Sequence, residues 1–405
     1  MEDKTNHMSQ TIKIVNGKII LIDRIIPNGT VLIRNGIIQA IEEGDITISD
    51  AEEIDAKGQY ISPGFIDIHV HGGGGHDFMD GTTAAFLQIA EIHAKHGTTA
   101  MLPTTLSSEK EDLLSTLSAY DAANKINTKG ASFLGMHLEG PYFAMNQRGA
   151  QDPKYIRDPD PVEYKEILEN NPSIKRWSAA PELKGAIAFG KYVTSKGVLA
   201  AIAHTDAIYE EVLEAFQNGY SLATHFYSAM SGVTRRNAYR YAGVIETAYL
   251  LDEMDVEIIA DGKHLPAPLL QLIYKIKGPQ HTALITDAMR AAGMAEGKST
   301  LGNITNGLEV IVEDGVAKLP DRSSFAGSVA TTDRLVRTMM QVAGISLIDS
   351  IQMITETPAR IMGVNHKKGK LQVGKDADLL IFDEDITIEM TMVNGRIVYQ
   401  NEPLK

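Results

Sequence analysis

Eight short apolar runs between residues 65 and 286 constrain the fold more than any other feature of this 405-residue chain. Stretches with apolar residues three and four positions apart, which are typical of helices, fill most of the gaps between the runs. Buried strands that alternate with helices form either a closed (β/α)8 barrel or an open parallel sheet. Eight such units indicate a (β/α)8 TIM-like barrel more readily than an open sheet. The runs are 65–70, 98–103, 132–138, 174–180, 198–203, 221–224, 256–260 and 282–286.

Both ends of the chain have a different sequence pattern, which is typical of short strands separated by turns. Strands are predicted at 11–15, 18–22, 30–34 and 36–41, with Asn16-Gly17 and Asn35-Gly36 as hairpin turns. Residues 369–399 show the same pattern. We therefore predict a small β-sandwich module built from residues 1–62 and 366–405, and a barrel domain from residues 63–365. The first ten residues are predicted to be disordered.

The segment after the eighth apolar run is predicted to hold an insertion and two further helices. Residues 302–318 have the pattern of a hairpin, and helical patterns follow at 331–342 and 346–356. Ser346 directly precedes the second of these patterns and is a suitable N-cap residue.

The composition excludes several functional classes. A net charge of −14 argues against nucleic acid as a partner, since such affinity depends on clustered Lys and Arg. The chain has no cysteine, so any metal must be held by His, Asp and Glu. No apolar run approaches the roughly 18 residues of a membrane span, and the first residues lack the pattern of a signal peptide. We expect a cytoplasmic protein without a membrane partner.

Two histidines at the end of the first apolar run suggest half of a metal site. Side chains two apart on a strand share a face, so His69 and His71 point the same way, directly before the glycines at 72–75. An isolated His-x-His pair more often only caps a strand, so other parts of the chain would have to supply further ligands. His93 and His96 lack the His-Glu-x-x-His spacing and are interpreted as packing or surface residues.

Histidines and carboxylates also follow the third to eighth predicted strands, and barrel enzymes carry their reactive residues at strand carboxyl ends. Three or more His and carboxylate ligands with an open position describe a hydrolytic zinc or iron site, with manganese and cobalt as alternatives. One divalent ion could be held by Glu139, His204 and His225. A second could be held by His69, His71 and Asp287, with Glu139 as a bridge. The strand-end residues are His69, His71, Glu139, Glu182, His204, His225, Asp261, His264 and Asp287.

The motifs around these residues resemble the N-acetylglucosamine-6-phosphate deacetylases of the amidohydrolase superfamily. The similarity spans nearly the whole chain, and its specific part is the spacing of the Glu139 segment to His204, His225, His264 and Asp287. The motif at 374–379 is shared by amidohydrolases broadly. The matching segments are 63–71, 137–141, 203–206, 224–225, 259–264 and 284–288.

The resemblance implies hydrolysis of the N-acetyl group of N-acetylglucosamine-6-phosphate to glucosamine-6-phosphate and acetate. It implies Glu139, His204 and His225 as metal ligands. Asp287 would accept a proton from water and deliver it to the departing amine. His264 would contact sugar hydroxyls, and Phe325 is a further candidate substrate contact.

The resemblance also points to the two-metal subtype, because this chain keeps His69 and His71. Gln151 stands where one-metal relatives place a histidine that polarises the acetyl carbonyl. With one or two metal ions bound, the metal and Gln151 would stabilise the oxyanion.

The predicted phosphate site departs from the pattern of the family. Backbone amides near Ser228 and Ala229, and an arginine reaching across a homodimer interface, would hold the phosphate. Relatives usually carry Asn-Ala-Met and then a proline-rich stretch ending in Arg-Glu-Pro-Gly, whereas residues 228–240 read Ser-Ala-Met-Ser-Gly-Val-Thr-Arg-Arg-Asn-Ala-Tyr-Arg. Arg236 is the best positional match, with Arg235 and Arg240 close by. The galactosamine epimer or another N-acyl substrate would fit equally well.

Two rival interpretations remain. Cyclic-amide hydrolases on the same barrel usually place a modified lysine at the fourth strand, where this chain has Glu182. A barrel kept only as a binding protein would be expected to have lost ligands, and none of the expected set is missing.

Overall fold

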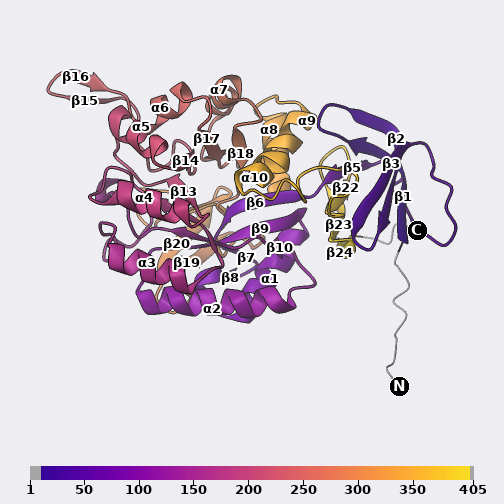
Figure 1. Ribbon diagram of the computed structural model, residues 1–405, viewed down its shortest axis with the longest axis horizontal. Coiled ribbons are helices and arrows are strands. Elements are labelled where there is room, and N and C mark those ends of the chain that lie inside the picture. Colours follow the sequence, from indigo (N-terminus) through magenta and orange to yellow (C-terminus); the bar gives the residue numbers. More distant parts are fainter. Residues whose placement is uncertain (1–10, 402–405) are drawn as a thin grey trace.

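The computed structural model describes residues 11–401, and its main body is a parallel β-barrel surrounded by helices (Figure 1). The strands pair in the order β6, β9, β11, β12, β13, β14, β17, β18. A bridge between Val70 and Ala288 and a 2.9 Å hydrogen bond from Asp287 N to His69 O join the last strand to the first. The predicted TIM-like barrel is confirmed. The strands are β6 (Phe65–Val70), β9 (Thr98–Thr105), β11 (Met136–Glu139), β12 (Ile174–Ala179), β13 (Leu199–Ile202), β14 (Tyr220–Ala223), β17 (Asp255–Ile258) and β18 (Thr282–Leu284).

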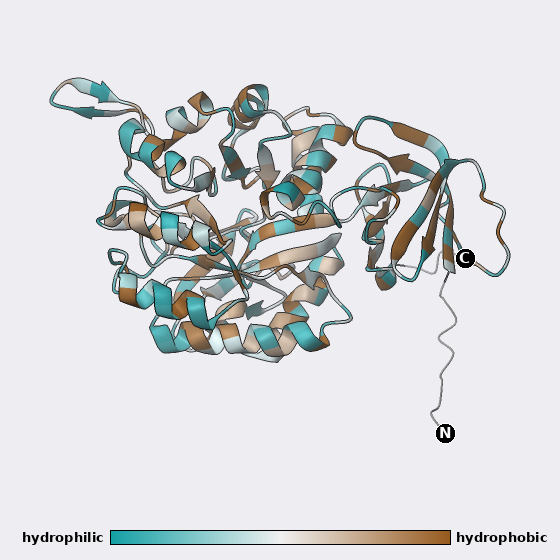
Figure 2. Ribbon diagram, viewed as in Figure 1, coloured by the Kyte–Doolittle hydropathy of each residue, from teal (hydrophilic) through white to brown (hydrophobic). Residues whose placement is uncertain are grey.

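A helix follows each barrel strand and packs its apolar side on the barrel. Helix α1 buries Phe86 and Ile89, for example, and α7 buries Leu270 and Ile273, all within one continuous core. Figure 2 shows hydrophilic and hydrophobic residues alternating along these helices, as their sequence period requires. The helices are α1 (Thr83–Ala94), α2 (Lys110–Ile126), α3 (Pro161–Asn170), α4 (Ala186–Ser195), α5 (Tyr209–Gln217), α6 (Val244–Leu250), α7 (Ala267–Lys277) and α8 (Thr332–Gln341).

Two more helices follow α8 in the sequence, α9 (Leu347–Ile354) and α10 (Glu356–Ile361). The predicted N-cap of α9 is confirmed, because the Ser346 side chain accepts a hydrogen bond from Asp349 N. Within residues 11–401, no helix is long and apolar enough to cross a membrane.

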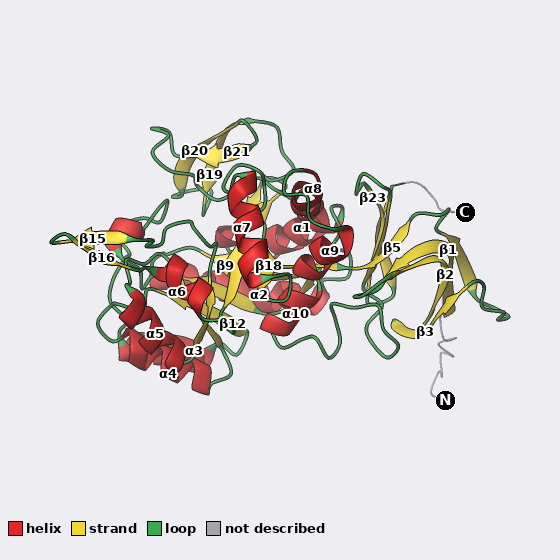
Figure 3. Cartoon of the chain, turned by 90° about the horizontal axis from the view of Figure 1, so that it is seen from above, coloured by secondary structure: helices red, strands yellow, loops and turns green. Residues whose placement is uncertain are grey.

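Strands from both ends of the chain form one sheet beside the barrel (Figures 1 and 3). Its order is β24, β23, β22, β5, β1, β2, β3, with β4 paired to β1, and its apolar residues form a separate core. Hydrogen bonds join all eight strands into one sheet, whereas a sandwich has two, so the β-sandwich description stays a prediction. The domain boundaries at residues 62 and 366 also stay predictions. The strands are β1 (Thr11–Ile20), β2 (Ile25–Arg34), β3 (Ile37–Glu43), β4 (Glu52–Asp55), β5 (Tyr60–Pro63), β22 (Leu379–Phe382), β23 (Ile388–Val393) and β24 (Arg396–Gln400).

One of the two predicted hairpin turns in this sheet is wrong. Strand β1 continues through Asn16 and Gly17, with φ of 57° at Asn16 and register shifts on both sides of Gly17. An extra residue in a strand makes a bulge that kinks the strand without reversing it. The other turn, Asn35-Gly36, has positive φ at both residues and connects β2 to β3 as predicted.

Two other boundaries differ from prediction. The run 132–138 is divided into β10 (Ser132–Phe133) and β11 because Gly135, with φ of 128°, interrupts the strand. The predicted hairpin at 302–318 is a three-stranded antiparallel sheet of β19 (Gly297–Leu301), β20 (Leu308–Glu313) and β21 (Val316–Lys318), seen in Figure 3. The predicted disorder of residues 1–10 lies outside the described residues.

Short elements lie in the loops that follow the barrel strands. Two-stranded ribbons are formed by β7 (Gly72–Gly73) with β8 (His76–Asp77) and by β15 (Thr234–Arg236) with β16 (Tyr239–Tyr241). The single-turn helices are η1 (Phe78–Asp80) and η2 (Met145–Gln147).

Candidate functional site

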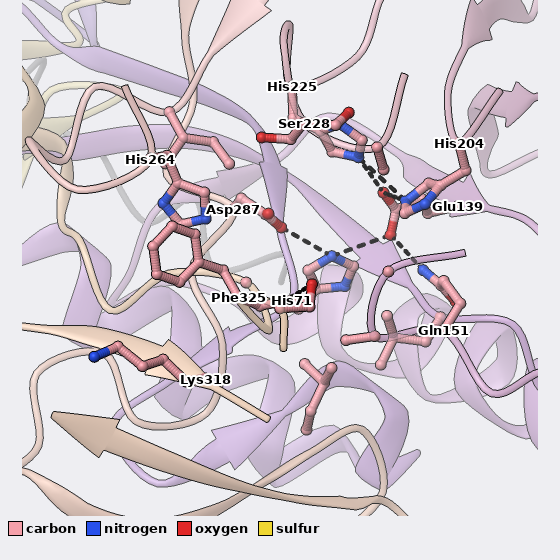
Figure 4. Close-up of a pocket in the computed structure, with 18 of the residues that line it drawn as sticks. His71, Glu139, Gln151, His204, His225, Ser228, His264, Asp287, Lys318 and Phe325 are labelled. Atoms are coloured by element: carbon pink, nitrogen blue, oxygen red, sulfur yellow. Dashed lines mark hydrogen bonds and ion pairs between the residues drawn. The ribbon is translucent and has the colours of Figure 1, made fainter. Parts of the chain in front are cut away.

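Six of the nine predicted strand-end residues line a cavity of about 510 Å³ at the carboxyl ends of the barrel strands (Figure 4). The barrel therefore brings together side chains that are up to 218 positions apart in the sequence, from His69 to Asp287. Of the predicted residues, those lining the cavity are His71, Glu139, Gln151, His204, His225, Ser228, Ala229, His264, Asp287 and Phe325. His69 lies just beneath them and has no exposed surface.

Glu139 stands at the centre of the site. Its Oε1 lies 3.1 Å from His225 Nε2 and 3.4 Å from His204 Nε2, and these two imidazole nitrogens are 3.3 Å apart. On its other side, His69 Nε2 lies 3.4 Å from Oε1 and His71 Nε2 lies 3.4 Å from Oε2. One carboxylate is thus shared by two pairs of histidines.

Three of these residues have unusual backbone conformations. His204, His225 and Asp287 have φ of 49°, 34° and 48°, in the left-handed region that is uncommon for residues other than glycine. Each follows directly after or shortly after the last residue of a barrel strand, at the point where the chain turns away. Such strain of about 1–3 kcal/mol persists where the surrounding structure enforces it, and it is found preferentially at functional sites.

Backbone carbonyls fix two of the imidazole rings. His204 Nδ1 lies 2.7 Å from Gln147 O, and His225 Nδ1 lies 3.1 Å from Ser228 O. A carbonyl only accepts, so each Nδ1 carries a proton, and in the neutral imidazole Nε2 then has the lone pair that a cation can bind. This arrangement is usual for histidines that bind metal ions.

The spacing of the donor atoms fits a cation on each side of Glu139. Ligand atoms about 2.0–2.1 Å from a tetrahedral ion lie about 3.3–3.4 Å from one another. The distances among Glu139, His204 and His225 are 3.1–3.4 Å. His69 Nε2 and His71 Nε2 are 3.2 Å apart and complete a similar set with Glu139. Two imidazole lone pairs so close together repel each other unless a cation or a proton lies between them.

The electrostatics of the cluster also favour positive charge. Burial works to raise the pKa of Glu139, but the charge of His69 and hydrogen bonds with His204 and His225 outweigh it and hold the pKa well below its usual range. Burial works to lower the pKa of His71, yet its contacts with Asp287 and Glu139 raise it to about 10. Buried carboxylates therefore require either protons on the imidazoles or bound cations.

Asp287 lies beside the His69 and His71 pair. Its Oδ1 is 3.2 Å from His71 Nε2 and 3.5 Å from His69 Nε2. Burial works to raise the pKa of Asp287, but the charge of His69 and the contact with His71 hold it below its usual value. The carboxylate is ionised at neutral pH and can accept a proton at the edge of the cavity.

The side chain of Gln151 makes two hydrogen bonds that the sequence did not indicate. Its Nε2 donates to Glu139 Oε2 at 2.8 Å, and its Oε1 accepts from Ser107 N at 2.9 Å. Gln151 therefore orients the shared carboxylate, a role that the sequence did not indicate, and also borders the cavity.

The opposite wall of the cavity carries the other predicted substrate contacts. His264 Nδ1 lies 2.9 Å from Asp261 Oδ2, so the carboxylate accepts from Nδ1. The Phe325 ring lies 4.7 Å from the His264 ring, and 39% of Phe325 is exposed in spite of its apolar character. Lys318 and Arg322, which the sequence did not single out, also line this wall. Lys318 ends β21 and Arg322 follows it shortly after, in a segment where no motif marked them.

The three candidate phosphate-binding arginines and Glu182 do not line the cavity of their own chain. Arg236 lies on β15, in the exposed hairpin that projects from the upper left of the molecule in Figure 1. Arg235 and Arg240 pair with each other across the same hairpin. Glu182 accepts hydrogen bonds from Thr205 Oγ1 and from the backbone N of Asp206, so it braces a loop.

Comparison with known proteins agrees with this geometry. The amidohydrolase family profile, described as "Amidohydrolase family", matches residues 60–398. The N-acetylglucosamine-6-phosphate deacetylase of Lysinibacillus sphaericus is 34% identical over 86% of this chain and 88% of its own length. The N-acetylgalactosamine-6-phosphate deacetylase of Escherichia coli O157:H7 is 29% identical over 90% of this chain and 93% of its own. Among solved structures, a mutant of the N-acetyl-D-glucosamine-6-phosphate deacetylase of Mycobacterium smegmatis, in complex with N-acetyl-D-glucosamine-6-phosphate, superimposes with a TM-score of 0.88 and 28% identity. It covers 96% of this chain and 100% of that one.

Proposed function

The chain belongs to the amidohydrolase family, and from that premise we propose that it is a metal-dependent deacetylase that converts N-acetylglucosamine-6-phosphate to glucosamine-6-phosphate and acetate. The observation that carries the proposal is the single carboxylate of Glu139 between two histidine pairs, with Asp287 beside one of them. Relatives that share most of the chain length and are named for this reaction support the choice of substrate.

Two groups of residues would hold the metal ions for amide hydrolysis. Glu139, His204 and His225 would hold one ion, and His69, His71 and Asp287 a second, with Glu139 shared. A divalent cation bound there polarises the acetyl carbonyl and lowers the pKa of water from about 15.7 to about 7. Zinc or iron suits these ligands, with manganese and cobalt as alternatives.

Asp287 would carry the proton. It is ionised at neutral pH and faces the cavity, so it can take a proton from the attacking water and then give it to the departing amine. Gln151 would donate to the oxygen of the tetrahedral intermediate after its Nε2 leaves Glu139. His264 and Phe325 would hold the sugar from the opposite wall.

The test is release of free amine from N-acetylglucosamine-6-phosphate and N-acetylgalactosamine-6-phosphate, side by side, with metal-reconstituted protein. We expect the gluco compound to react faster. A faster reaction of the galacto compound would support the second candidate, which is favoured by the altered segment at 228–240 and by the Escherichia coli relative. Failure of both compounds in the presence of bound, chelator-sensitive metal would refute the proposal.

The phosphate would be bound between two copies of the chain. Ser228 and Ala229 line the cavity, and the positive φ of Ala229 turns the loop at this point. Arg236 is exposed on its hairpin and is absent from the lining of its own cavity, so it would reach the phosphate of a partner subunit in a homodimer. Lys318 and Arg322 lie at the same cavity but are paired with Glu313.

Mixing two variants tests the homodimer. Arg236→Ala is expected to raise KM strongly, and Asp287→Asn to abolish turnover. Dimers that combine the two chains contain one site with both Asp287 and the partner's intact Arg236, so a refolded mixture should recover about a quarter of the wild-type sites. Recovery no greater than the sum of the separate variants would refute an arginine that acts across the interface.

Other functions fit the geometry less well. A bridging modified lysine, typical of cyclic-amide hydrolases, has no counterpart, because Glu182 is turned toward Thr205 and Asp206. A binding protein without activity would not need the ionised Asp287 beside an intact ligand set. We also propose residence in the cytoplasm and a two-part chain, with residues 63–365 as the catalytic barrel.

A further inference from the structure

A buried ion pair crosses the barrel interior below the candidate metal centre. Arg176 on β12 and Glu257 on β17 have no exposed surface. Arg176 Nη2 donates to Glu257 Oε2 at 2.8 Å, and Nη1 contacts Oε1, so the pair is bidentate. Nothing in the proposed reaction uses either residue.

The pair also touches the strands that carry the candidate ligands. Arg176 Nη1 donates to Ile68 O at 3.1 Å, and Nη2 donates to Thr224 Oγ1 at 2.8 Å. Ile68 directly precedes His69, and Thr224 directly precedes His225. A guanidinium with these four contacts ties β12 and β17 to the ends of β6 and β14.

The four candidate histidine ligands differ in how their outer nitrogen is held. Backbone carbonyls accept from Nδ1 of His204 and His225. His69 Nδ1 and His71 Nδ1 have no hydrogen-bond partner among the described residues. Behind His69, however, Glu257 Oε2 lies 3.8 Å from Nδ1.

At 3.8 Å this contact is electrostatic, since it is longer than a hydrogen bond. A carboxylate at this distance still favours a proton on Nδ1 and therefore a lone pair on Nε2, the atom that faces His71 and Glu139. The His137 ring packs edge-on against His69 at 4.8 Å, which limits rotation of the imidazole. Ligating histidines commonly direct their outer nitrogen at such a carboxylate.

The energetics of a buried pair make a purely structural role a poor explanation. Desolvation of two buried charges can exceed their mutual attraction, and apolar residues of similar volume are often equally stable or more so. Stability alone therefore does not explain why the barrel interior contains this pair.

We propose that Arg176 and Glu257 are positioning residues for the cation held by His69 and His71: Glu257 sets the orientation and tautomer of His69, and Arg176 holds Glu257 in place. This inference extends the proposed function and rests on its two cation positions, but it does not depend on the identity of the substrate.

The proposal predicts a selective loss of one ion. His225 keeps its backbone anchors without the pair, because Thr224 N bonds to Ile202 O at 2.9 Å and His225 Nδ1 bonds to Ser228 O. The cation among Glu139, His204 and His225 should therefore remain. The affinity at His69 and His71 should fall about 10- to 100-fold, the usual effect of removing such an outer partner.

The experiment compares metal binding by wild type, the double variant Arg176→Met/Glu257→Met and the single variant Glu257→Gln. The double variant removes both charges, so no buried charge is left unpaired. Glu257→Gln keeps the shape of the side chain and serves as the second test variant if the double variant does not fold. Lys368→Met/Asp378→Asn removes another largely buried pair that does not line the cavity, and serves as the control. Ions per chain are measured by elemental analysis after dialysis against graded Zn²⁺, and the Tm of each metal-free protein is recorded.

We expect two ions in the wild type and the control, and one tight and one weakened ion in both test variants. The metal-free Tm of the double variant should be close to wild type, whereas that of Glu257→Gln should be lower, because the buried charge of Arg176 is left unpaired. Two ions of wild-type affinity in a folded test variant would overturn the proposal, as would equal loss of both ions. A single ion in the wild type would refute the two-cation premise. Amine release measured on the same wild-type preparation then shows whether the proposed deacetylase activity is also absent or is present without a second cation.

Discussion

Replacement of Asp287 by asparagine is the most direct test of the proposed chemistry, because the structure predicts a large kinetic effect in a variant that keeps the fold. Asp287 has φ of 48°, which asparagine also tolerates. Its backbone N donates to His69 O at 2.9 Å, and its backbone O accepts from Ser328 N at 2.7 Å. Asparagine has the same shape and keeps both bonds, so the variant should fold, and loss of the charge beside His71 should lower the free energy of unfolding by about 1–3 kcal/mol.

The expected kinetic effect follows from the carboxylate. Its Oδ1 lies 3.2 Å from His71 Nε2, and its pKa is held below the usual value, so the group is ionised at neutral pH. An amide cannot accept the water proton. Loss of general acid–base catalysis lowers kcat by about 10²- to 10⁴-fold, which corresponds to about 3–5 kcal/mol of activation free energy. KM should change only a few-fold, since the cavity wall is unaltered.

Steady-state amine release and elemental analysis on the same preparation measure both quantities. Asp321→Asn, which makes the same chemical change at an exposed turn after β21, is the matched control and should behave as wild type. If Asp287→Asn kept more than about a tenth of wild-type kcat with the wild-type metal content, Asp287 would not be the proton carrier.

Four further predictions concern metal, pH and folding. Glu139→Gln should remove both ions, because this carboxylate faces both histidine pairs; two ions by elemental analysis would contradict its central role. Chelation of the wild type should lower the free energy of unfolding by about 3–4 kcal/mol for each ion bound at a hundred to a thousand times its Kd, measured by denaturant titration. Burial lowers the pKa of His93 from 6.5 to about 4, so its contribution to stability is complete above pH 6.5 and falls by up to about 3 kcal/mol as the pH decreases to 4. His93→Gln, which can still donate to Gly72 O, should flatten this dependence in denaturation curves. Ser346→Ala should cost about 1 kcal/mol of unfolding free energy, because Asp349 N loses its cap.

The order of the barrel was predictable from sequence because the relevant signals are local. A run of apolar residues identifies a strand buried on both faces, and the three-to-four period identifies the helix that follows. The same two-residue strand period placed His69 and His71 on one face. Where local signals are ambiguous, the prediction failed: Asn16-Gly17 has the chemistry of a tight turn, yet β1 accommodates it as a bulge.

The sequence by itself therefore determined which residues stand at strand ends and which kinds of ligand are available. Only the tertiary structure decided how far apart they are, because barrel closure and strand stagger set distances between residues remote in the chain. Glu139 meets His225 across 86 positions, and Arg176 meets Glu257 across 81. No local period contains this information. Arg236 was only the best positional match to the family's arginine, and the tertiary structure was needed to show that it lies on a hairpin outside its own cavity.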